Sequence, residues 1–313
     1  MKFLFDFDDT LWDIDKEDIS IENIKLLNKL DNAVIISGNT FESIKFKIEK
    51  ALGSIDKCNI DIWADYNTTL YRKGKPIDFI EDFSINSISN DYLDNIMTQY
   101  NLLDKYSIIK SYTGKIIGIK IKPLSEEERS YLVDDLHINN CKTVKAGRTT
   151  IDILNNLNNK CYILQTYYNK DDCIYFGDEI EYGNDNEIAY SCKDYIKIDN
   201  IEQINRFLKR GKLIYGLIIS AGNQSRFKST TPKALVNLGD FNLLDINISE
   251  MKPYVDKIYI VCSYNNEFYF SNYKNRIVIE SGKGCGDAVM QALAMLHKDS
   301  YSIIKWRRFT TYK

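Results

Sequence analysis

The sequence predicts an α/β fold: a Rossmannoid parallel sheet with an α+β insert, followed by a second α/β domain. Short apolar runs typical of buried strands alternate with segments of helical periodicity, both before residue 56 and after residue 147. Between these positions, strictly alternating apolar residues indicate strands of a different kind. A chain of 313 residues is long enough for two domains, each with its own core.

The first 52 residues predict a strand–helix–strand–helix order. Residues 3–5 are an apolar run typical of a buried strand, and the apolar spacing in "IENIKLLNKL" (21–30) predicts a helix. "NAVIIS" (32–37) is the second strand. Residues 41–52 form a second helix, which Thr40 could cap.

Residues from about 56 to 147 are predicted to form an α+β insert, or cap. "NIDIWADYNTTLYRKGKPI" is typical of a β-hairpin with Gly74 in its turn. "GKIIGIKIKPLSEEERSYLVDDL" first alternates strictly and then becomes helical. Ser125 precedes this helix and Glu128 follows three residues later, which is the spacing of a capping box.

After the insert, strands at "TTIDIL" and "CIYF" with a helix between them restore the α/β pattern. We therefore predict a first domain of residues 1–208, with its core at 1–55 and 148–208. "KRGK" (209–212) is a plausible linker. Strands such as "LIYGLIIS" and "KIYIVCS" then predict a second domain at 213–313.

Composition narrows the class of protein. The net charge of -3 argues against a nucleic-acid surface recognised by charge alone. Seven scattered cysteines without a C-x-x-C pair favour a reduced compartment over a disulfide framework or a zinc site. The chain shows no signal-peptide pattern and no apolar run of about 18 residues. We therefore expect a cytoplasmic protein with no membrane partner.

Four separated fragments carry groups that suit phosphate chemistry: "FDFDDT" (5–10), "IISGNT" (35–40), Lys160 and "YFGDEIEYGNDNE" (175–187). Three of them follow predicted strands directly, and Lys160 lies near the start of a predicted helix. Because the carboxyl ends of parallel strands lie along one edge of a sheet, we expect the fragments to converge there.

The chemistry of these fragments is complementary. Mg²⁺ prefers oxygen ligands, which Asp6, Asp178 and a backbone carbonyl near Asp8 could supply. Ser37 and the backbone N–H groups that follow it could bind phosphate oxygens, and Lys160 could neutralise the transferring group. Each fragment alone has a simpler interpretation, because an acidic turn or a lysine is usually a solvated surface feature.

The four fragments together resemble the motifs of the haloacid dehalogenase superfamily of phosphotransferases, in the family's order, over residues 1–208. The resemblance implies that Asp6 is the nucleophile and forms an aspartyl-phosphate. Asp8 would protonate the leaving alcohol and later activate water. The residues implied for phosphate binding are Thr10, which would steady its loop, Ser37, Gly38, which would leave room for phosphate, and Lys160. The residues implied for Mg²⁺ are Asp6, Asp8, Asp178 and Asp185.

The insert resembles the cap of the subgroup that contains phosphomannomutases, sucrose-phosphate phosphatases and related sugar phosphatases. "ADYNTTLYRKGKPI", "GRTTIDIL" and "GDEIEYGNDNEIA" carry that comparison. Asp185 lies seven positions after Asp178, which is farther than in many relatives. Arg148 and Asn184 are candidate substrate residues, although a surface salt bridge is an equal interpretation of Arg148.

A second group of residues suggests a nucleotide site after the linker. "GLIISAGNQSRFKSTTPKALVNLGDFNLLD" resembles the opening of sugar-1-phosphate nucleotidyltransferases, A-G-x-G-x-R followed by P-K. The residues implied for nucleotide binding are Ala221, Gly222, Arg226, Lys233 and Gly286, the last at a predicted helix start. Gln224 stands where the second glycine is expected. Arg307 and Arg308 stand where that family has a metal-binding aspartate.

We therefore expect a truncated nucleotidyltransferase-like domain with weak nucleotide binding, no transferase activity and an exposed sheet edge through which copies could associate. An unrelated α/β domain is the alternative. For the whole chain we expect a Mg²⁺-dependent phosphatase of a small metabolite, most simply a sugar phosphate, in nucleotide-sugar metabolism. A phosphomannomutase-like sugar phosphomutase and a non-catalytic remnant are the two alternatives.

Overall fold

The computed structural model describes residues 1–85, 88–146, 149–181, 185–222, 231–280 and 284–305. The chain divides into two compact units, Met1–Asn205 and Arg206–Lys313. Within the described residues, no helix combines the length and the apolar character that crossing a membrane requires.

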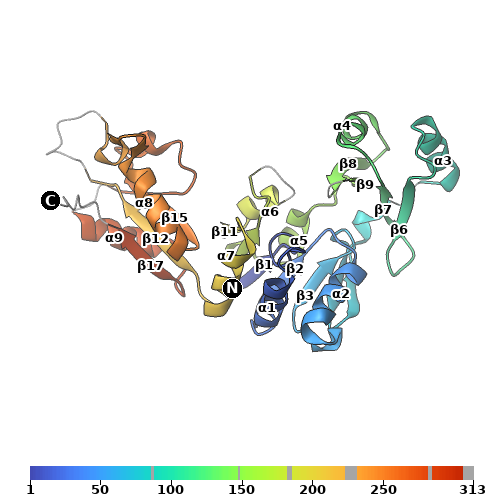
Figure 1. Cartoon of the computed structure of the whole chain (residues 1–313), viewed down its shortest axis with the longest axis horizontal. Coiled ribbons are helices and arrows are strands. Elements are labelled where there is room, and N and C mark those ends of the chain that lie inside the picture. The colour runs from blue at the N-terminus through green and yellow to red at the C-terminus, as the bar shows by residue number, and fades with distance from the viewer. Residues whose placement is uncertain (86–87, 147–148, 182–184, 223–230, 281–283, 306–313) are drawn as a thin grey trace. The chain divides into compact units, whose positions relative to one another are not determined.

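A seven-stranded sheet forms the centre of the first unit, in the order β11-β10-β1-β2-β3-β4-β5 (Figure 1). Its strands are β1 (Lys2–Phe5), β2 (Ala33–Ile36), β3 (Asp61–Ala64), β4 (Thr69–Arg72), β5 (Lys75–Phe79), β10 (Cys173–Gly177) and β11 (Asp194–Lys197). From β11 to β3 the neighbours are parallel, while β3, β4 and β5 form an antiparallel meander. The carboxyl ends of the parallel strands therefore share one edge.

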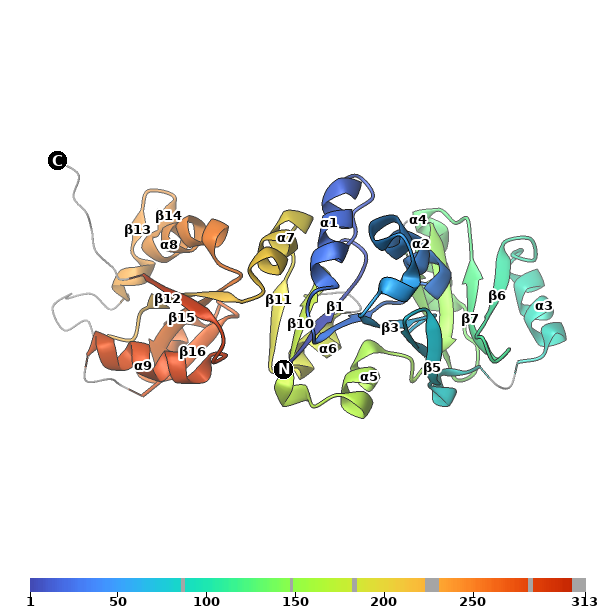
Figure 2. The ribbon, with the colours of Figure 1, turned by 90° about the horizontal axis from the view of Figure 1, so that it is seen from below.

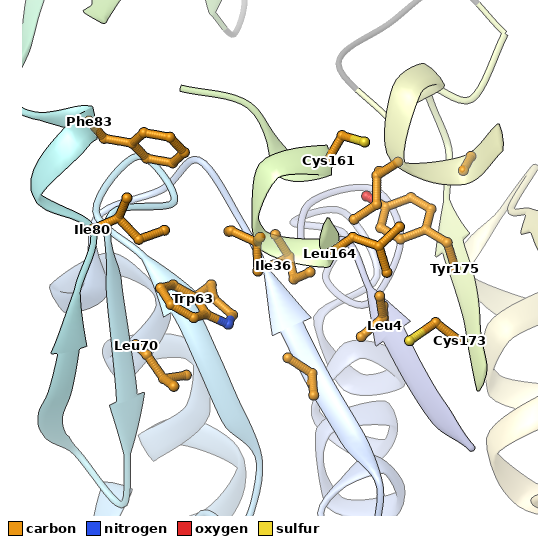
Figure 3. Packing of buried hydrophobic residues seen from close by; sticks show 14 of the residues in the cluster. Leu4, Ile36, Trp63, Leu70, Ile80, Phe83, Cys161, Leu164, Cys173 and Tyr175 are labelled. Atoms are coloured by element: carbon orange, nitrogen blue, oxygen red, sulfur yellow. The ribbon is translucent and has the colours of Figure 1, made fainter. Parts of the chain in front are cut away.

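Helices cover both faces of this sheet (Figure 2). They are α1 (Glu17–Leu27), α2 (Phe41–Leu52) and α7 (Ile201–Arg210) on one face, and α5 (Lys160–Tyr167) and α6 (Asn186–Ser191) on the other. Short 3-10 turns are η1 (Ile55–Lys57), η2 (Glu81–Phe83) and η3 (Lys170–Asp172). Under α5 and α6, the side chains of Leu4, Ile36 and Trp63 pack with Leu164 and Tyr175 (Figure 3). This packing fixes α5 over the sheet.

The first unit also contains an antiparallel sheet of four strands in the order β6-β7-β9-β8. We call it the small sheet, and the seven-stranded sheet the main sheet. The strands of the small sheet are β6 (Tyr106–Lys110), β7 (Ile116–Ile121), β8 (Cys141–Ala146) and β9 (Thr150–Asn155), and the helices of this part of the chain are α3 (Asn90–Gln99) and α4 (Glu126–Asp135). Apolar residues of α3 and α4 pack on one face. The predicted capping box is confirmed: the Glu128 N–H donates to Ser125 Oγ at 3.2 Å, and the Ser125 N–H donates to the Glu128 carboxylate at 2.6 Å.

Strand pairing differs from the predicted insert of residues 56–147 at both of its ends. The hairpin near its start joins the main sheet, because β3 pairs in parallel with β2. The strand predicted for the core at "TTIDIL" is β9, which pairs with β7 and β8 of the small sheet. The small α+β layer therefore begins after β5 and ends with β9. Alternation in a sequence indicates a strand but does not say which sheet the strand joins.

The second unit contains a parallel sheet in the order β16-β15-β12-β17 and a short antiparallel ribbon, β13-β14. Its strands and helices are β12 (Ile214–Ile219), β13 (Asn237–Leu238), β14 (Phe241–Asn242), α8 (Leu243–Met251), β15 (Lys257–Ser263), β16 (Arg276–Ile279), α9 (Cys285–Met295) and β17 (Tyr301–Lys305). Its 3-10 turns are η4 (Lys233–Leu235), η5 (Lys252–Tyr254) and η6 (Glu267–Phe270). The predicted α/β fold class is confirmed. Self-association through an edge such as β17 stays a prediction.

Candidate active site

The turn after β1 places the first two candidate carboxylates. Asp6 follows the strand directly, and its N–H donates to the Phe176 carbonyl of β10 at 2.8 Å. The Phe7 carbonyl accepts the N–H groups of Leu11 and Trp12 at 2.9 and 3.0 Å, and all three side chains are buried. The apolar residues of this stretch therefore anchor the turn, while the alternating aspartates face the sheet edge.

Lys160 lies between two carboxylates at that edge. Its Nζ donates to Asp6 Oδ1 at 2.5 Å and to Asp185 Oδ1 at 2.6 Å. Tyr175 completes the group, because its hydroxyl donates to Asp185 Oδ1 at 2.7 Å. The Lys160 side chain is 3% exposed and that of Asp185 is 1% exposed. Lys160 begins α5 and Asp185 precedes α6, so the packing of these two helices brings the two side chains together.

Burial and charge shift the ionisation of this cluster. The pKa of Asp6 is raised to about 8, mainly by burial; Lys160 opposes the shift, and the charges of Asp185 and Asp178 add to it. Burial also raises the pKa of Asp178 to about 6, with Asp185 adding to the shift. Burial lowers the pKa of Lys160, but Asp6 and Asp185 outweigh it and raise the pKa overall. The cluster therefore has an excess of negative charge.

The residues present fit a divalent cation. Among the described residues, oxygens of Asp6, Asp178 and Asp185 lie within 4.8 Å of one another. When all three carboxylates are ionised, they exceed the charge of the one lysine by two, and Asp185 Oδ2 is buried without a hydrogen-bond partner in the part of the chain that the structure describes. Thr10 Oγ1 donates to Asp178 Oδ1 at 3.3 Å and so orients it. Hard oxygen ligands of this kind suit Mg²⁺.

Without a cation, the free energy of unfolding is expected to fall as the pH rises from about 4 to about 8. The pKa values in the folded state are raised to about 6 for Asp178 and to about 8 for Asp6. In this range the folded state therefore binds more protons than the unfolded state. The stability that protonated Asp178 and Asp6 contribute is lost as the pH passes these values. Urea unfolding in EDTA across this range measures the effect. The Asp6→Asn variant should show a shallower fall, and an equal fall in both proteins would contradict the assignment.

Gly177, at the end of β10, lets the cluster close. A Cβ at this position would lie 2.3 Å from Asp185 Oδ2 and 2.8 Å from Tyr175 Cε1. Both side chains are buried and cannot retreat freely. Gly177, in "YFGDE", therefore allows Asp185 to approach the end of β10. The position of this glycine in the sequence did not by itself indicate this role.

Gly177→Ala is expected to weaken Mg²⁺ binding by about tenfold or more, because the new methyl group displaces the Asp185 carboxylate. It should also lower the free energy of unfolding by about 1–3 kcal/mol. Calorimetric titration with Mg²⁺ and urea unfolding measure the two effects. Gly38→Ala is the matched control for stability, since a Cβ there meets nothing within 4 Å. Equal Mg²⁺ affinity in Gly177→Ala and the unmodified protein would show that Asp185 does not support the cation.

The loop after β2 holds the predicted phosphate-binding serine. The Ser37 N–H donates to the Trp63 carbonyl at 3.0 Å, and Ser37 Oγ accepts the Asn39 N–H at 3.1 Å. Thr40 occupies the N-cap position of α2, but its side chain makes no capping hydrogen bond. Asp65 caps the helix instead, because its Oδ1 accepts the Phe41 N–H at 2.7 Å. A residue 25 positions away thus replaces the predicted cap.

Asp8 lies beside the carboxylate cluster rather than in it. Lys47 of α2 donates to Asp8 Oδ1 at 2.8 Å, and the Asn39 amide donates to Asp8 Oδ2. Its side chain is 48% exposed and is not among the three carboxylates that could hold a metal ion. A carbonyl ligand near Asp8 stays a prediction. Lys47 and Asn39 were not identified from the sequence, because a helical lysine and a turn asparagine carry no distinguishing pattern.

Three of the predicted residues, Arg148, Asn184 and Arg226, lie outside the described residues. In the second unit, Ala221 and Gly222 follow β12 closely, Lys233 begins η4, and Gly286 is the second residue of α9. Within the residues that the structure describes, no atom beyond the adjoining residues lies within 4 Å of a Cβ placed at Gly222 or Gly286. Their role in nucleotide binding stays a prediction.

No family model matches the chain. A curated relative, Bifunctional protein GlmU of Ruthia magnifica subsp. Calyptogena magnifica, is 33% identical over 97 residues, which are 30% of this chain and 22% of that protein. The chain thus spans about a fifth of the curated relative it matches.

Several solved structures are similar to the chain. A haloacid dehalogenase-like hydrolase from Bacteroides thetaiotaomicron has a TM-score of 0.47 at 11% identity, covering 66% of this chain and 98% of its own. Plasmodium falciparum IMP-nucleotidase has a TM-score of 0.44 at 14% identity, covering 67% and 60%. A trehalose-6-phosphate phosphatase related protein has a TM-score of 0.41 at 15% identity, covering 67% and 96%.

Proposed function

We propose that the chain is a Mg²⁺-dependent phosphohydrolase that uses Asp6 as the nucleophile. The observation that carries this proposal is the placement of Lys160 between Asp6 and Asp185, with Asp178 close enough to share a cation. This arrangement presents a nucleophile beside positive charge at the carboxyl edge of a parallel sheet. An acidic turn facing water would have no need of a buried lysine.

The proposed reaction has two steps. A carboxylate oxygen of Asp6 attacks phosphorus, the bond from phosphorus to the substrate oxygen breaks, and Asp8 gives that oxygen a proton. Water then attacks the phosphorus of the aspartyl-phosphate while Asp8 takes its proton, which releases inorganic phosphate and restores Asp6. Lys160 holds Asp6 Oδ1, so we assign the attack to Oδ2. Asp8 is half exposed and can turn toward the substrate.

Mg²⁺ would be held by Asp6 and Asp178, with Asp185 in support, and would offset charge on the phosphoryl oxygens. Ser37 would donate to a phosphate oxygen. Gly38 leaves space above this loop, because no atom of the described residues beyond the adjoining ones lies within 4 Å of a Cβ placed there. Thr10 would hold Asp178 in place through the hydrogen bond described above.

We further propose a sugar phosphate as the substrate, on the evidence of a polar cluster on the face of the small sheet opposite α3 and α4. Asp152 of β9 is 6% exposed and accepts the Tyr66 hydroxyl at 3.3 Å. Lys120 of β7, its neighbour across the strands, lies 5.5 Å from the Tyr66 ring. Tyr66 follows Asp65 in the loop after β3, and the Asp65 N–H donates to the Asn39 carbonyl at 2.7 Å, so the chain at Tyr66 lies next to the loop that carries Ser37. A carboxylate and an ammonium group together suit neighbouring hydroxyls.

Asp152→Asn is expected to raise KM for the preferred sugar phosphate by about tenfold, because the amide replaces an acceptor for substrate hydroxyls. Turnover of p-nitrophenyl phosphate, which carries no such hydroxyls, should be unchanged. Steady-state kinetics with both substrates measure the difference. An equal change for both would place the effect in the fold or in the phosphate site and not in sugar recognition.

The test of the proposed function is phosphate release from a panel of sugar phosphates, with Mg²⁺ or with EDTA. We expect release that EDTA abolishes. A phosphomutase is a second candidate because it would use the same aspartates, and ³¹P NMR separates the two by showing interconversion of the 1- and 6-phosphates without release. No turnover by a folded protein that binds Mg²⁺ would favour the non-catalytic remnant, against which the intact carboxylate cluster counts.

For the second unit we propose a nucleotidyltransferase-like domain with weak nucleotide binding, linked to nucleotide-sugar metabolism in the cytoplasm. The support is its parallel sheet together with the open space at Gly222 and Gly286. Equilibrium dialysis with a labelled nucleoside triphosphate tests the binding. Retention of the label only by protein that also carries an intact Asp6 site would place the nucleotide in the first unit and contradict this proposal.

A further inference from the structure

A polar pocket of about 290 Å³ lies where the chain passes between the main sheet and the small sheet of the first unit. Its polar lining comes from the outgoing connection after β5, from the turn before β8 and from the end of β9. These residues, which define the junction pocket, are Glu81, Asp82, Ser84, Asn139, Asn140 and Asn155. None of them belongs to the candidate active site.

Hydrogen bonds join the end of β9 to the connection after β5 and to the turn before β8 at the junction pocket. The Asn155 amide donates to the Ser84 carbonyl at 3.0 Å, and the Asn156 N–H donates to the Asn140 carbonyl at 3.0 Å. The outgoing connection also reaches the small sheet, because the Ile85 N–H donates to the Ile116 carbonyl at 2.8 Å. A molecule in the junction pocket would therefore contact the segments that set how the small sheet is held against the main sheet.

The buried hydroxyl of Ser84 indicates that the junction pocket holds a hydrogen-bonding ligand. Its side chain is 3% exposed, and its Oγ has no hydrogen-bond partner within the described residues. A buried hydroxyl without a partner costs about 1–3 kcal/mol, so native proteins usually satisfy such a group with a ligand or water. The cavity beside it supplies the room for one.

The chemistry of the lining selects the ligand. Among the described residues, the lining of the junction pocket includes two carboxylates and no lysine or arginine. Those carboxylates are already engaged: Glu81 pairs with Lys115, and Asp82 accepts the Tyr162 hydroxyl at 3.0 Å. A phosphorylated ligand would meet negative charge here. Amides, carboxylates and a hydroxyl can all bond to sugar hydroxyls, which both donate and accept. The volume lies at the lower end of ligand pockets and suits a molecule of about monosaccharide size.

We propose that the junction pocket binds a small uncharged polyol of monosaccharide size, and that this binding alters turnover at the Asp6 site. The binding itself does not depend on the proposed function, whereas its effect on turnover rests on it. Removal of phosphate from a sugar phosphate yields a molecule of this class, so the reaction product is the natural source of the ligand.

The test uses the full chain and titrates D-glucose, D-mannose and myo-inositol by calorimetry and saturation-transfer NMR. We expect at least one to bind with a dissociation constant in the millimolar range. Ser84→Ala, which removes the hydroxyl, and Asn139→Trp, which fills the junction pocket from its exposed rim, should each weaken binding at least about tenfold. Asp6→Asn should bind the polyol as before.

Two results would overturn the proposal. One is the absence of polyol binding by the folded chain. The other is binding that Asp6→Asn weakens and that Ser84→Ala and Asn139→Trp leave unchanged, which would place the polyol in the active site. If the chain turns over p-nitrophenyl phosphate, the bound polyol should change the rate at least about twofold, and Asn139→Trp should remove this response without changing the basal rate. If no substrate is turned over, the binding result stands alone, so failure of the proposed function remains distinguishable.

Discussion

Asp6→Asn is expected to lower kcat for the best sugar phosphate by at least about 10³-fold, because an amide cannot form the proposed aspartyl-phosphate. The substitution preserves the shape of the side chain and removes an ionisable carboxyl group, whose pKa is raised to about 8 mainly by burial. The free energy of unfolding should therefore be kept or increased in the absence of metal. Phosphate release and urea unfolding, measured on the same preparations, separate loss of chemistry from loss of structure.

Asp15→Asn is the matched control for this prediction, since it makes the same chemical change at an exposed position outside the cluster. It should leave both kcat and stability unchanged. If Asp6→Asn kept more than about a tenth of the activity, Asp6 would not be the nucleophile.

Lys160→Met is expected to abolish phosphate release and to lower the free energy of unfolding by about 3–5 kcal/mol, because Asp6 and Asp185 lose their common buried cation. The lysine makes ion pairs of 2.5 and 2.6 Å with these two carboxylates. Methionine keeps the length of the side chain and leaves the charges unpaired. Thermal and urea unfolding in EDTA measure the loss.

The double variant Lys160→Met, Asp185→Asn is the control for charge. It should recover part of the lost stability but none of the activity, because the unpaired carboxylate is removed while the phosphate site stays incomplete. Added Mg²⁺ should also stabilise the single variant more than the unmodified protein. A single variant as stable as the unmodified protein would show that the buried ion pairs do not hold the cluster together.

The parts of the site that follow apolar strands were predictable from the sequence. Asp6, Ser37 and Asp178 each come directly after a buried run, and the strands are parallel, so their ends meet at one edge. Lys160 was predicted near the start of a helix, but its place beside Asp6 depends on the packing of α5 on the sheet. For the three residues that follow strands, a local pattern and a rule of sheet geometry were enough to place them at this edge.

The remaining features depend on contacts between distant segments. Lys47 lies in the middle of α2, and only the fold brings it to Asp8. Asp65 caps α2 from the loop after β3, and Tyr175 turns from β10 toward Asp185. The prediction that β9 belongs to the core of the first domain was wrong for the same reason, because alternation within six residues does not identify the neighbouring strand.

Trapping the intermediate tests the central claim most directly. The Asp8→Asn variant is mixed with acetyl phosphate, whose acidic leaving group needs no proton from residue 8, and the reaction is quenched in acid and reduced with borohydride. The account predicts that peptide mass spectrometry finds the reduction product of an acyl-phosphate at residue 6, and none in the Asp6→Asn protein. Phosphate release in single turnover with no modified residue 6, or with the modification at another carboxylate, would contradict it.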